Sequence, residues 1–470
     1  MPRRHSPARA RKAEPSRSPS PASRPRPPRP LAEEVDARGR VRFQLWLDGH
    51  SIRRPPLASV RMPRRLAAEL RAVFLPAGYP DSVRPEYLRF QVFDTVQAAC
   101  SYLRGILTTS ALLRGAGVGE TAASPMAAAV AWVLRDGFGM FGSLVFSYAF
   151  GCGFDRNVKE WRLFADLIND VGLCLDMLAP LTGSPTAFAI VAALGAACKS
   201  ICGMVAGACR ASVTAHFALK SNLADVSAKE GAQETAVTLL GLLLGSWLAN
   251  ALGDSQLTCW AAFLVLTAVH VWANWLGVAS LRLTNLNRQR AALVCRLWWS
   301  APNDEERLRL LTPAHVAALE RPWGPLLHSL TGPRLASRLL PLVGHAGGSD
   351  DAAVLSELAR LYQGEAYLIR MDSTGKLRAA LSSDATGETL LKVLFHCELL
   401  QHLQLSGRAV ACSSSYSTGL HTAEMITLAE AITTVREAWP SFVSALRDSG
   451  WQEPAVSLDS VAGIRVNIIS

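Results

Sequence analysis

The sequence is poor in charge and lacks the short motifs that mark common enzyme classes. Only 18% of its 470 residues are Asp, Glu, Lys or Arg, and 50% are hydrophobic, which is an apolar balance for a soluble enzyme. The ten cysteines form no CxxC pair, and no HExxH motif, P-loop lysine or serine-hydrolase elbow occurs. These absences argue against a disulfide framework, a zinc site and nucleotide hydrolysis. We therefore expect a protein that is not an enzyme, and its cofactor, if any, is unknown.

Most of the net positive charge lies at the N-terminus. Residues 1–30 hold nine Arg or Lys against one acid, which leaves only +2 of the total charge of +10 for the rest of the chain. A body with so little net positive charge predicts no nucleic-acid partner. The same N-terminal segment is rich in Pro and Ser and has no apolar run, so we expect residues 1–40 to be a disordered tail. An Arg- and Ser-rich, acid-poor start is also typical of an organelle transit peptide, and both interpretations stay open.

Two long stretches of the sequence contain no charged residue. Residues 235–253 and 255–281 are separated only by Asp254, and each has the length of about 20 residues that a membrane-crossing helix needs. They predict a transmembrane hairpin, with the lipid bilayer as a partner. The alternative is a pair of buried helices in a large soluble bundle. Arg282 and Arg288 follow the second stretch and place that end on the cytosolic or equivalent side.

The fold class predicted is mainly α, a helical membrane-embedded bundle followed by a small α/β C-terminal domain. The tail is followed by a short β-hairpin and linker at 41–69, a helical domain at 70–295 and an α/β domain at 305–470. In the last domain, Pro440 is expected to break or restart the final helix. The further elements predicted are bundle helices near 92–114, 122–150, 160–180, 186–219, 235–252 and 256–284, strands at 365–372, 376–382 and 461–469, and a helix at 386–405.

Polar residues at helical spacing form two stripes in this otherwise apolar region. If the stripes face each other inside the bundle, they line a hydrated pocket or path for a cation or a polar ligand. The alternative is a network of ion pairs and caps that holds the helices together, and a metal-dependent reaction at the carboxylates is a third possibility. The first stripe is Lys159, Arg162, Asp166, Asn169 and Asp170, and the second is Asn222, Asp225, Lys229 and Gln233, with Arg162–Asp166 and Asp225–Lys229 spaced to pair.

The small residues and the histidines of the helical region are predicted to pack between helices rather than to form a catalytic or metal site. Gly203/Gly207 and Gly241/Gly245 have the spacing that lets two helices approach closely. His216 and His270 are single histidines in apolar helices, and we expect each to be packed and hydrogen-bonded rather than a metal ligand.

Three polar-rich stretches, with the apolar segment that follows them, resemble one known family. The stretches are FLPAGYPDSVRPEYLRFQVFDTVQ at 74–97, KEWRLFADLINDVG at 159–172 and SNLADVSAKEGAQET at 221–235, followed by TAVHVWAN at 267–274. In order and spacing they resemble the root UVB sensitive (RUS) family over about residues 70–290. The similarity is looser in the C-terminal domain, and Lys220-Ser221-Asn222 departs from the family's usual Arg-Asn-Asn run.

The resemblance implies a membrane protein linked to UV-B response, early development, auxin transport and vitamin B6 homeostasis. It also implies a plastid or other organelle membrane, another family member as a homo- or hetero-oligomer partner, and a pyridoxal-type vitamer as a small ligand. No catalytic residue is implied. We expect a non-enzymatic protein that binds a partner or a small ligand, and the alternative is a small-solute transporter with polar residues lining a path.

Overall fold

The computed structural model describes residues 30–35, 41–48, 51–53, 62–116, 125–151, 154–253, 255–322, 349–371, 376–405 and 418–452. The chain splits into two compact units, residues 1–72 and 73–470, which are described separately.

The N-terminal unit contains a small antiparallel sheet in the order β1-β2-β3. Strands β2 (Val41–Asp48) and β3 (Ser51–Arg53) pair around the predicted turn, which confirms the hairpin. Strand β1 (Pro30–Val35) pairs with β2, so the expectation of disorder throughout residues 1–40 is wrong for this part of the tail. Its proline is the first residue of an edge strand, a position where proline is tolerated. The helix α1 (Met62–Phe74) ends this unit and begins the next.

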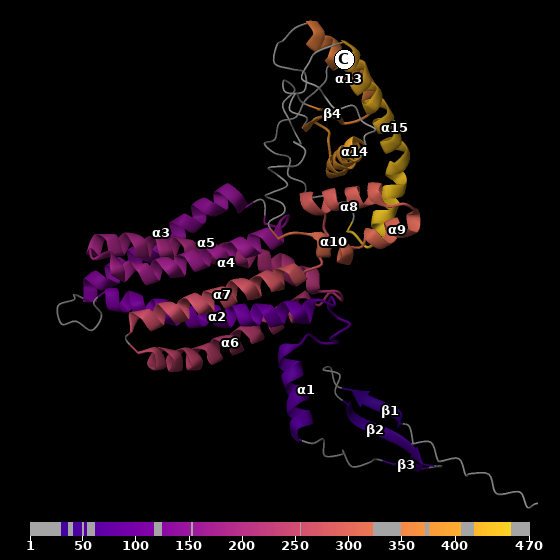
Figure 1. Cartoon of the computed structure of the whole chain (residues 1–470). Helices are drawn as coiled ribbons and strands as arrows, with labels where there is room; N and C mark the ends of the chain where they lie inside the picture. The colour runs from indigo at the N-terminus through magenta and orange to yellow at the C-terminus, as the bar shows by residue number, and fades with distance from the viewer. Residues whose placement is uncertain are drawn as a thin grey trace, which may run out of the picture. The chain divides into compact units, whose positions relative to one another are not determined.

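Six long helices of the second unit run alongside one another as a bundle (Figure 1). Helix α2 is central, and it packs against α4, α6 and α7, while α5 packs against α3 and α4. The mainly helical fold is therefore confirmed. The six helices are α2 (Tyr87–Gly115), α3 (Pro125–Phe150), α4 (Val158–Leu178), α5 (Pro185–Phe217), α6 (Leu223–Leu252) and α7 (Gln256–Ser280).

The predicted hairpin corresponds to α6 and α7, which turn at Gly253 with a positive φ of 59°. Both helices pack on α2, which lies between them in Figure 1. Gly241 lets α6 approach α2 closely, because an added Cβ would meet Tyr102 at 3.0 Å. The other predicted glycine pair, Gly203 and Gly207, has no atom within 4 Å of an added Cβ, so the expectation that it makes a close helix contact is wrong.

Two helix backbones approach closely at two single glycines that no spacing pattern revealed. A Cβ at Gly172 of α4 would lie 2.9 Å from the carbonyl oxygen of Gly195 in α5. A Cβ at Gly195 would lie 2.6 Å from Oδ1 of Asp176 and 3.0 Å from the carbonyl oxygen of Gly172. The α4–α5 crossing therefore requires glycine on both sides.

We expect Gly195→Ala to lower the free energy of unfolding by about 1–3 kcal/mol, because the added methyl group forces two packed backbones apart. Gly203→Ala in the same helix is the control. Its Cβ meets open space, and alanine's helix propensity should leave stability unchanged or higher by up to about 1 kcal/mol. Chemical unfolding of both variants in detergent measures the difference, and equal effects would contradict the assigned crossing.

The C-terminal part has its own hydrophobic core, which begins at α8 (Arg288–Ser300). The predicted hairpin is confirmed as antiparallel strands β4 (Tyr367–Met371) and β5 (Leu377–Leu381), and the predicted helix as α14 (Gly387–Leu405). The strand predicted at 461–469 lies outside the described residues. The remaining helices are α9 (Asp304–Leu310), α10 (Pro313–Leu319), α13 (Ser349–Leu361) and α15 (Thr418–Asp448).

The expectation that Pro440 breaks or restarts the final helix is wrong, because α15 continues through it. A proline inside a helix costs about 3 kcal/mol. Packing on both sides of it offsets this cost, since the rings of Trp439 and Phe442 lie 5.7 and 4.3 Å from that of Phe395. Phe442 is fully buried.

Buried His396 should make the C-terminal core sensitive to mild acid. Its Nδ1 lies 3.4 Å from the Tyr367 hydroxyl, and burial, aided by Lys392 and Arg436, lowers the pKa of His396 from 6.5 to about 3. Between pH 6.5 and about pH 3, His396 is therefore protonated in the unfolded chain and neutral in the folded chain. The free energy of unfolding therefore decreases as the pH falls below 6.5. We expect a loss of about 2 kcal/mol between pH 6.5 and pH 5 from this group.

Urea unfolding of wild type and His396→Gln at several pH values measures this effect. The variant should be less stable at neutral pH but flatter across this range. His402→Gln, at an exposed position of the same helix, is the control and should keep the wild-type slope. An unchanged slope in the His396 variant would contradict the assignment.

Candidate functional site

The centre of the bundle contains a buried ion pair between α2 and α4. The Arg104 side chain is fully buried, and its Nη1 donates to Oδ1 of Asp170 at 2.6 Å and to Oγ1 of Thr267 at 3.1 Å. His270 of α7 is also fully buried, with its Nδ1 3.2 Å from Oδ2 of Asp170. Asp170 of the first polar stripe therefore faces the bundle interior, and His270 is packed and hydrogen-bonded as predicted.

Asp166 lies one helical turn from Asp170 in the same interior. Its Oδ1 accepts a hydrogen bond from Nε2 of Gln97 at 2.8 Å. The same amide lies 3.1 Å from Nε2 of His270, so α2 links both carboxylates to α7. The spacing of Gln97 and Arg104 places them on one face of α2, two turns apart.

Arg162 connects this interior network to the surface. Its Nη2 donates to Oδ1 of Asp94 at 2.7 Å and to Oε1 of Gln97 at 3.3 Å. The predicted i,i+4 pair with Asp166 exists at 3.8 Å, but Asp94 is the closer partner. Asn169 donates from Nδ2 to Oγ of Ser101 at 3.4 Å. We call Asp94, Gln97, Arg104, Arg162, Asp166, Asp170 and His270 the interior network.

The second stripe contacts a different part of the chain. It forms hydrogen bonds with residues that precede α2. Asn222 donates to the carbonyl oxygen of Ser82 at 3.2 Å, and Oδ2 of Asp225 accepts from the backbone N–H of Ala77 at 2.7 Å. Gln233 donates to the carbonyl oxygen of Phe74 at 2.6 Å, and Lys229 belongs to the same helix. The structure therefore does not bring the two stripes together; the second one holds the 74–83 segment in place.

Lys159, the first member of the first stripe, lies outside the interior network. Its Nζ is 2.6 Å from Oε2 of Glu320, and Nη1 of Arg290 is 3.1 Å from Oε1 of the same carboxylate. All three side chains are at most 5% exposed. This triad joins α4 of the bundle to α8 and to the end of α10.

The two stripes predicted from the sequence omit the contribution of α2. A signal for it existed, because Gln91, Gln97 and Arg104 fall in a largely apolar helix, where buried polar residues need partners. Gln91 donates to Oε1 of Glu230 at 3.2 Å, and Oε2 of that carboxylate accepts from Thr214 at 2.7 Å. These bonds extend the buried polar contacts of α2 from the interior network toward the end of the bundle where α2 begins.

An apolar cluster borders the interior network on its other side. Leu107, Leu173 and Phe263 are its largest members and are each at most 5% exposed. Leu107 lies about one turn after Arg104 in α2, and Leu173 about one turn after Asp170 in α4. Phe263 lies about one turn before Thr267 in α7. The interior network therefore ends at this cluster.

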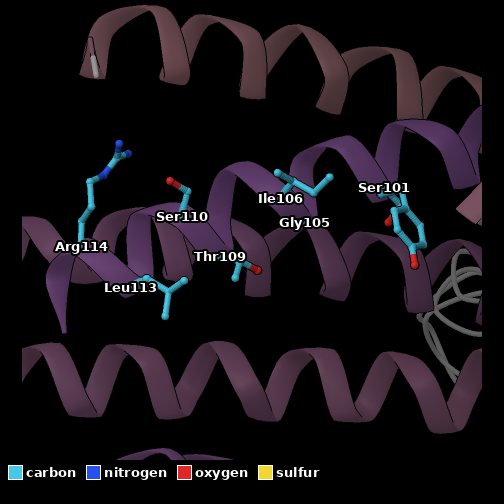
Figure 2. A pocket seen from close by; sticks show the side chains of 8 residues that line it. Ser101, Gly105, Ile106, Thr109, Ser110, Leu113 and Arg114 are labelled. Carbon is cyan, nitrogen blue, oxygen red and sulfur yellow. The ribbon is translucent and has the colours of Figure 1, made fainter. Parts of the chain in front are cut away.

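A groove of about 690 Å³ lies along α2 and borders the network at Ser101. Figure 2 shows how the side chains line it from one end to the other. This size falls in the range of small-molecule sites. Its lining combines small and hydroxyl side chains with an apolar floor and one cation: Ser101, Tyr102, Gly105, Ile106, Thr109, Ser110, Leu113 and Arg114.

The chain is similar to proteins of one family along most of its length. A family model described as the vitamin B6 photo-protection and homoeostasis domain matches residues 61–301, and the root UVB sensitive protein C-terminal domain matches residues 350–460. Protein root UVB sensitive 3 of Arabidopsis thaliana is 34% identical over 84% of this chain and 86% of its own length.

Two further relatives match shorter parts of the chain. RUS family member 1 of Dictyostelium discoideum is 43% identical over 47% of this chain and 42% of its own length. Protein root UVB sensitive 2, chloroplastic, of Arabidopsis thaliana is 32% identical over 54% of this chain and 57% of its own length. No solved structure matches the chain significantly.

Proposed function

Because the chain belongs to the root UVB sensitive family, we propose that it is a membrane-embedded, non-enzymatic protein that binds a small polar ligand. The groove along α2 is the proposed site, and pyridoxal-type vitamers are the first candidates. The proposal includes the family's link to UV-B response, early development and vitamin B6 homeostasis, and an organelle membrane. A relative whose name includes the word chloroplastic supports a plastid location.

The exposed side of the bundle supports embedding in lipid. Within the described residues, three helices, α5, α6 and α7, are long and apolar enough to cross a membrane. Along α6, Leu239, Leu243 and Trp247 are 59%, 72% and 67% exposed at successive helical turns. A soluble bundle would bury such a stripe, since a monomer rarely exposes a large contiguous apolar patch. This stripe is the observation that carries the proposal of a membrane protein.

The placement of the charges supports the same proposal. Arg104 and Asp170 face the bundle interior and pair with each other, as ionisable residues inside a membrane normally do. Carbonate extraction of the expressed chain tests the embedding. Retention in the membrane pellet is the expected result, and release of a detergent-free monomer would reject it.

The lining of the groove suits a small, flat, phosphorylated ring. Tyr102, Ile106 and Leu113 offer apolar contact, Thr109 offers a hydroxyl group, and Arg114 places a guanidinium group at one end. Guanidinium groups bind phosphate well. The family model named for vitamin B6 supports a pyridoxal-type vitamer as the occupant.

Filling the groove tests the ligand. We expect Gly105→Leu to weaken binding of pyridoxal 5′-phosphate by at least about tenfold, a loss of about 1.4 kcal/mol, because the new side chain occupies the groove. Gly203→Leu is the control, since both glycines have open space around an added Cβ. Isothermal titration in detergent measures both. Equal affinity in the two variants, or no binding by the wild type, would reject this ligand at this site.

A small-solute transporter is the second candidate, and the interior network favours it. Buried ionisable residues within a membrane bundle mark ion and substrate paths, and Asp166, Asp170 and His270 lie together inside this one. Flux of pyridoxine, of inorganic cations and of protons into liposomes that hold the purified chain tests this candidate. Flux abolished by Asp170→Asn would support it, and no flux across this panel would reject it.

A further inference from the structure

The interior network contains one more carboxylate than it contains guanidinium groups. Arg104 lies 2.6 Å from Asp170, and Arg162 lies 2.7 Å from Asp94, so each of these cations has a close carboxylate partner. Asp166 is the third carboxylate. Its approach to Arg162 is 3.8 Å, and Arg162 already pairs with Asp94. The uncompensated negative charge therefore belongs to Asp166.

The environment of Asp166 does not suit a permanent charge. The side chain is 7% exposed, and its Oδ2 is buried with no hydrogen-bond partner among the described residues. Its Oδ1 accepts a single hydrogen bond, from the neutral amide of Gln97. A buried carboxylate without a close cation or several donors costs several kcal/mol, and a bound proton removes that cost.

We propose that Asp166 is a proton-binding carboxyl group inside the bundle. The proton comes from water and bonds to Oδ2, which has no hydrogen-bond partner among the described residues and lies 3.8 Å from Nε of Arg162, while Oδ1 continues to accept from Gln97. With Asp166 protonated, each remaining carboxylate of the network, Asp94 and Asp170, has one guanidinium partner. This site goes beyond the proposed function, because it requires neither the ligand nor transport.

The residues around Asp166 also indicate from which end of the bundle a proton reaches it. Asp94, whose side chain is 35% exposed, lies near the start of α2 and pairs with Arg162, which contacts both Gln97 and Asp166. On the opposite side, the apolar cluster around Leu107 and Phe263 closes the interior. Asp166 therefore exchanges protons with water at the end of the bundle where α2 and α4 begin. The groups that face Asp166 are Asp94 and Gln97 of α2, Arg162 and Asp170 of α4, Cys202 of α5 and His270 of α7.

Infrared difference spectroscopy of the full chain in detergent tests the proposal directly. A protonated, buried carboxyl group gives a carbonyl stretch that carboxylates lack, and the band shifts in D2O. We expect this band in the wild type at a pH at which the exposed carboxyl groups are ionised and lack it, its loss as the pH rises further, and its absence from Asp166→Asn. Asp176→Asn is the matched control, because Asp176 is a buried aspartate of the same helix that pairs with Lys199 and Arg135.

The outcomes separate the proposal from its alternatives. A band that persists in Asp166→Asn, or that disappears in Asp176→Asn, overturns the assignment to Asp166. If the Asp166 variant fails to fold, ¹³C-labelled aspartate in the wild type must still shift the band, and an unshifted band overturns the proposal. Asp94→Asn should slow the D2O shift several-fold, and an unchanged rate overturns the route. These readouts do not depend on pyridoxal binding, so the two proposals fail separately.

Discussion

Arg104→Met should destabilise the bundle by about 3–5 kcal/mol, because it removes one partner of a buried ion pair and leaves the other charge behind. The Arg104 side chain is fully buried and Asp170 is 7% exposed, so water cannot replace the lost guanidinium group. Methionine keeps most of the aliphatic volume, which separates the loss of charge from the loss of packing. Thermal unfolding in detergent gives the change.

Two further variants establish the cause of that loss. Arg104→Met combined with Asp170→Asn removes both charges, keeps an acceptor for His270, and should recover most of the stability. Arg135→Met is the matched control, since Arg135 lies 3.8 Å from Asp176, which retains Lys199 as a partner. It should cost about 1 kcal/mol. A double variant as unstable as the single one would show that the methionine itself disrupts the packing.

The family and the positions of the helices could be predicted from the sequence, because local motifs identify the family and the lengths of the apolar runs indicate the helices. The resemblance carried by residues 74–97, 159–172 and 221–235 is confirmed by the family matches. Each bundle helix lies where the apolar runs predicted it. The start of α6 is the exception, since Leu223 precedes the predicted boundary at 235. The polar stretch there is helical because its Asn222, Asp225 and Gln233 bond to the 74–83 segment.

Partners across helices could not be predicted from spacing alone. Arg162 and Asp166 have the separation of an i,i+4 pair, yet Arg162 lies nearer to Asp94, 68 residues away. Lys159 shares a helical face with the network residues but pairs with Glu320, because α4 begins where the bundle meets the C-terminal part. Helical spacing defines a face, whereas the packing of distant segments decides which group meets it. The same reasoning explains why Gly172 and Gly195 were missed.

The junction between the bundle and the C-terminal part should be the most sensitive point outside the network. Glu320 is 2% exposed and is the shared partner of Lys159 and Arg290. Burial lowers the pKa of both cations, with Glu320 opposing the shift. Glu320→Gln removes that opposition and leaves two cations buried side by side. We expect it to lower the free energy of unfolding by about 3–5 kcal/mol.

The order of the effects distinguishes a charge imbalance from a general packing defect. Lys159→Met leaves Arg290 paired with Glu320, so it should cost only about 1–2 kcal/mol. Glu306→Gln, which breaks an exposed pair with Arg309, should cost less than about 0.5 kcal/mol. Urea unfolding gives the three values, and hydrogen exchange at residues 284–322 should accelerate most in Glu320→Gln. If Lys159→Met proves as damaging as Glu320→Gln, the triad does not act through its charge balance.

The pH dependence of Glu320→Gln provides an independent check. Without the carboxylate, the pKa of Lys159 in the folded chain falls further below its ordinary value of 10.5. The unfolded chain then binds more protons than the folded chain on the alkaline side of neutrality, so the variant's stability should rise as the pH rises toward that value. The wild type should gain less over the same range, because Glu320 holds the proton on Lys159. Parallel slopes for the two proteins in alkaline urea titrations would show that Lys159 does not depend on Glu320.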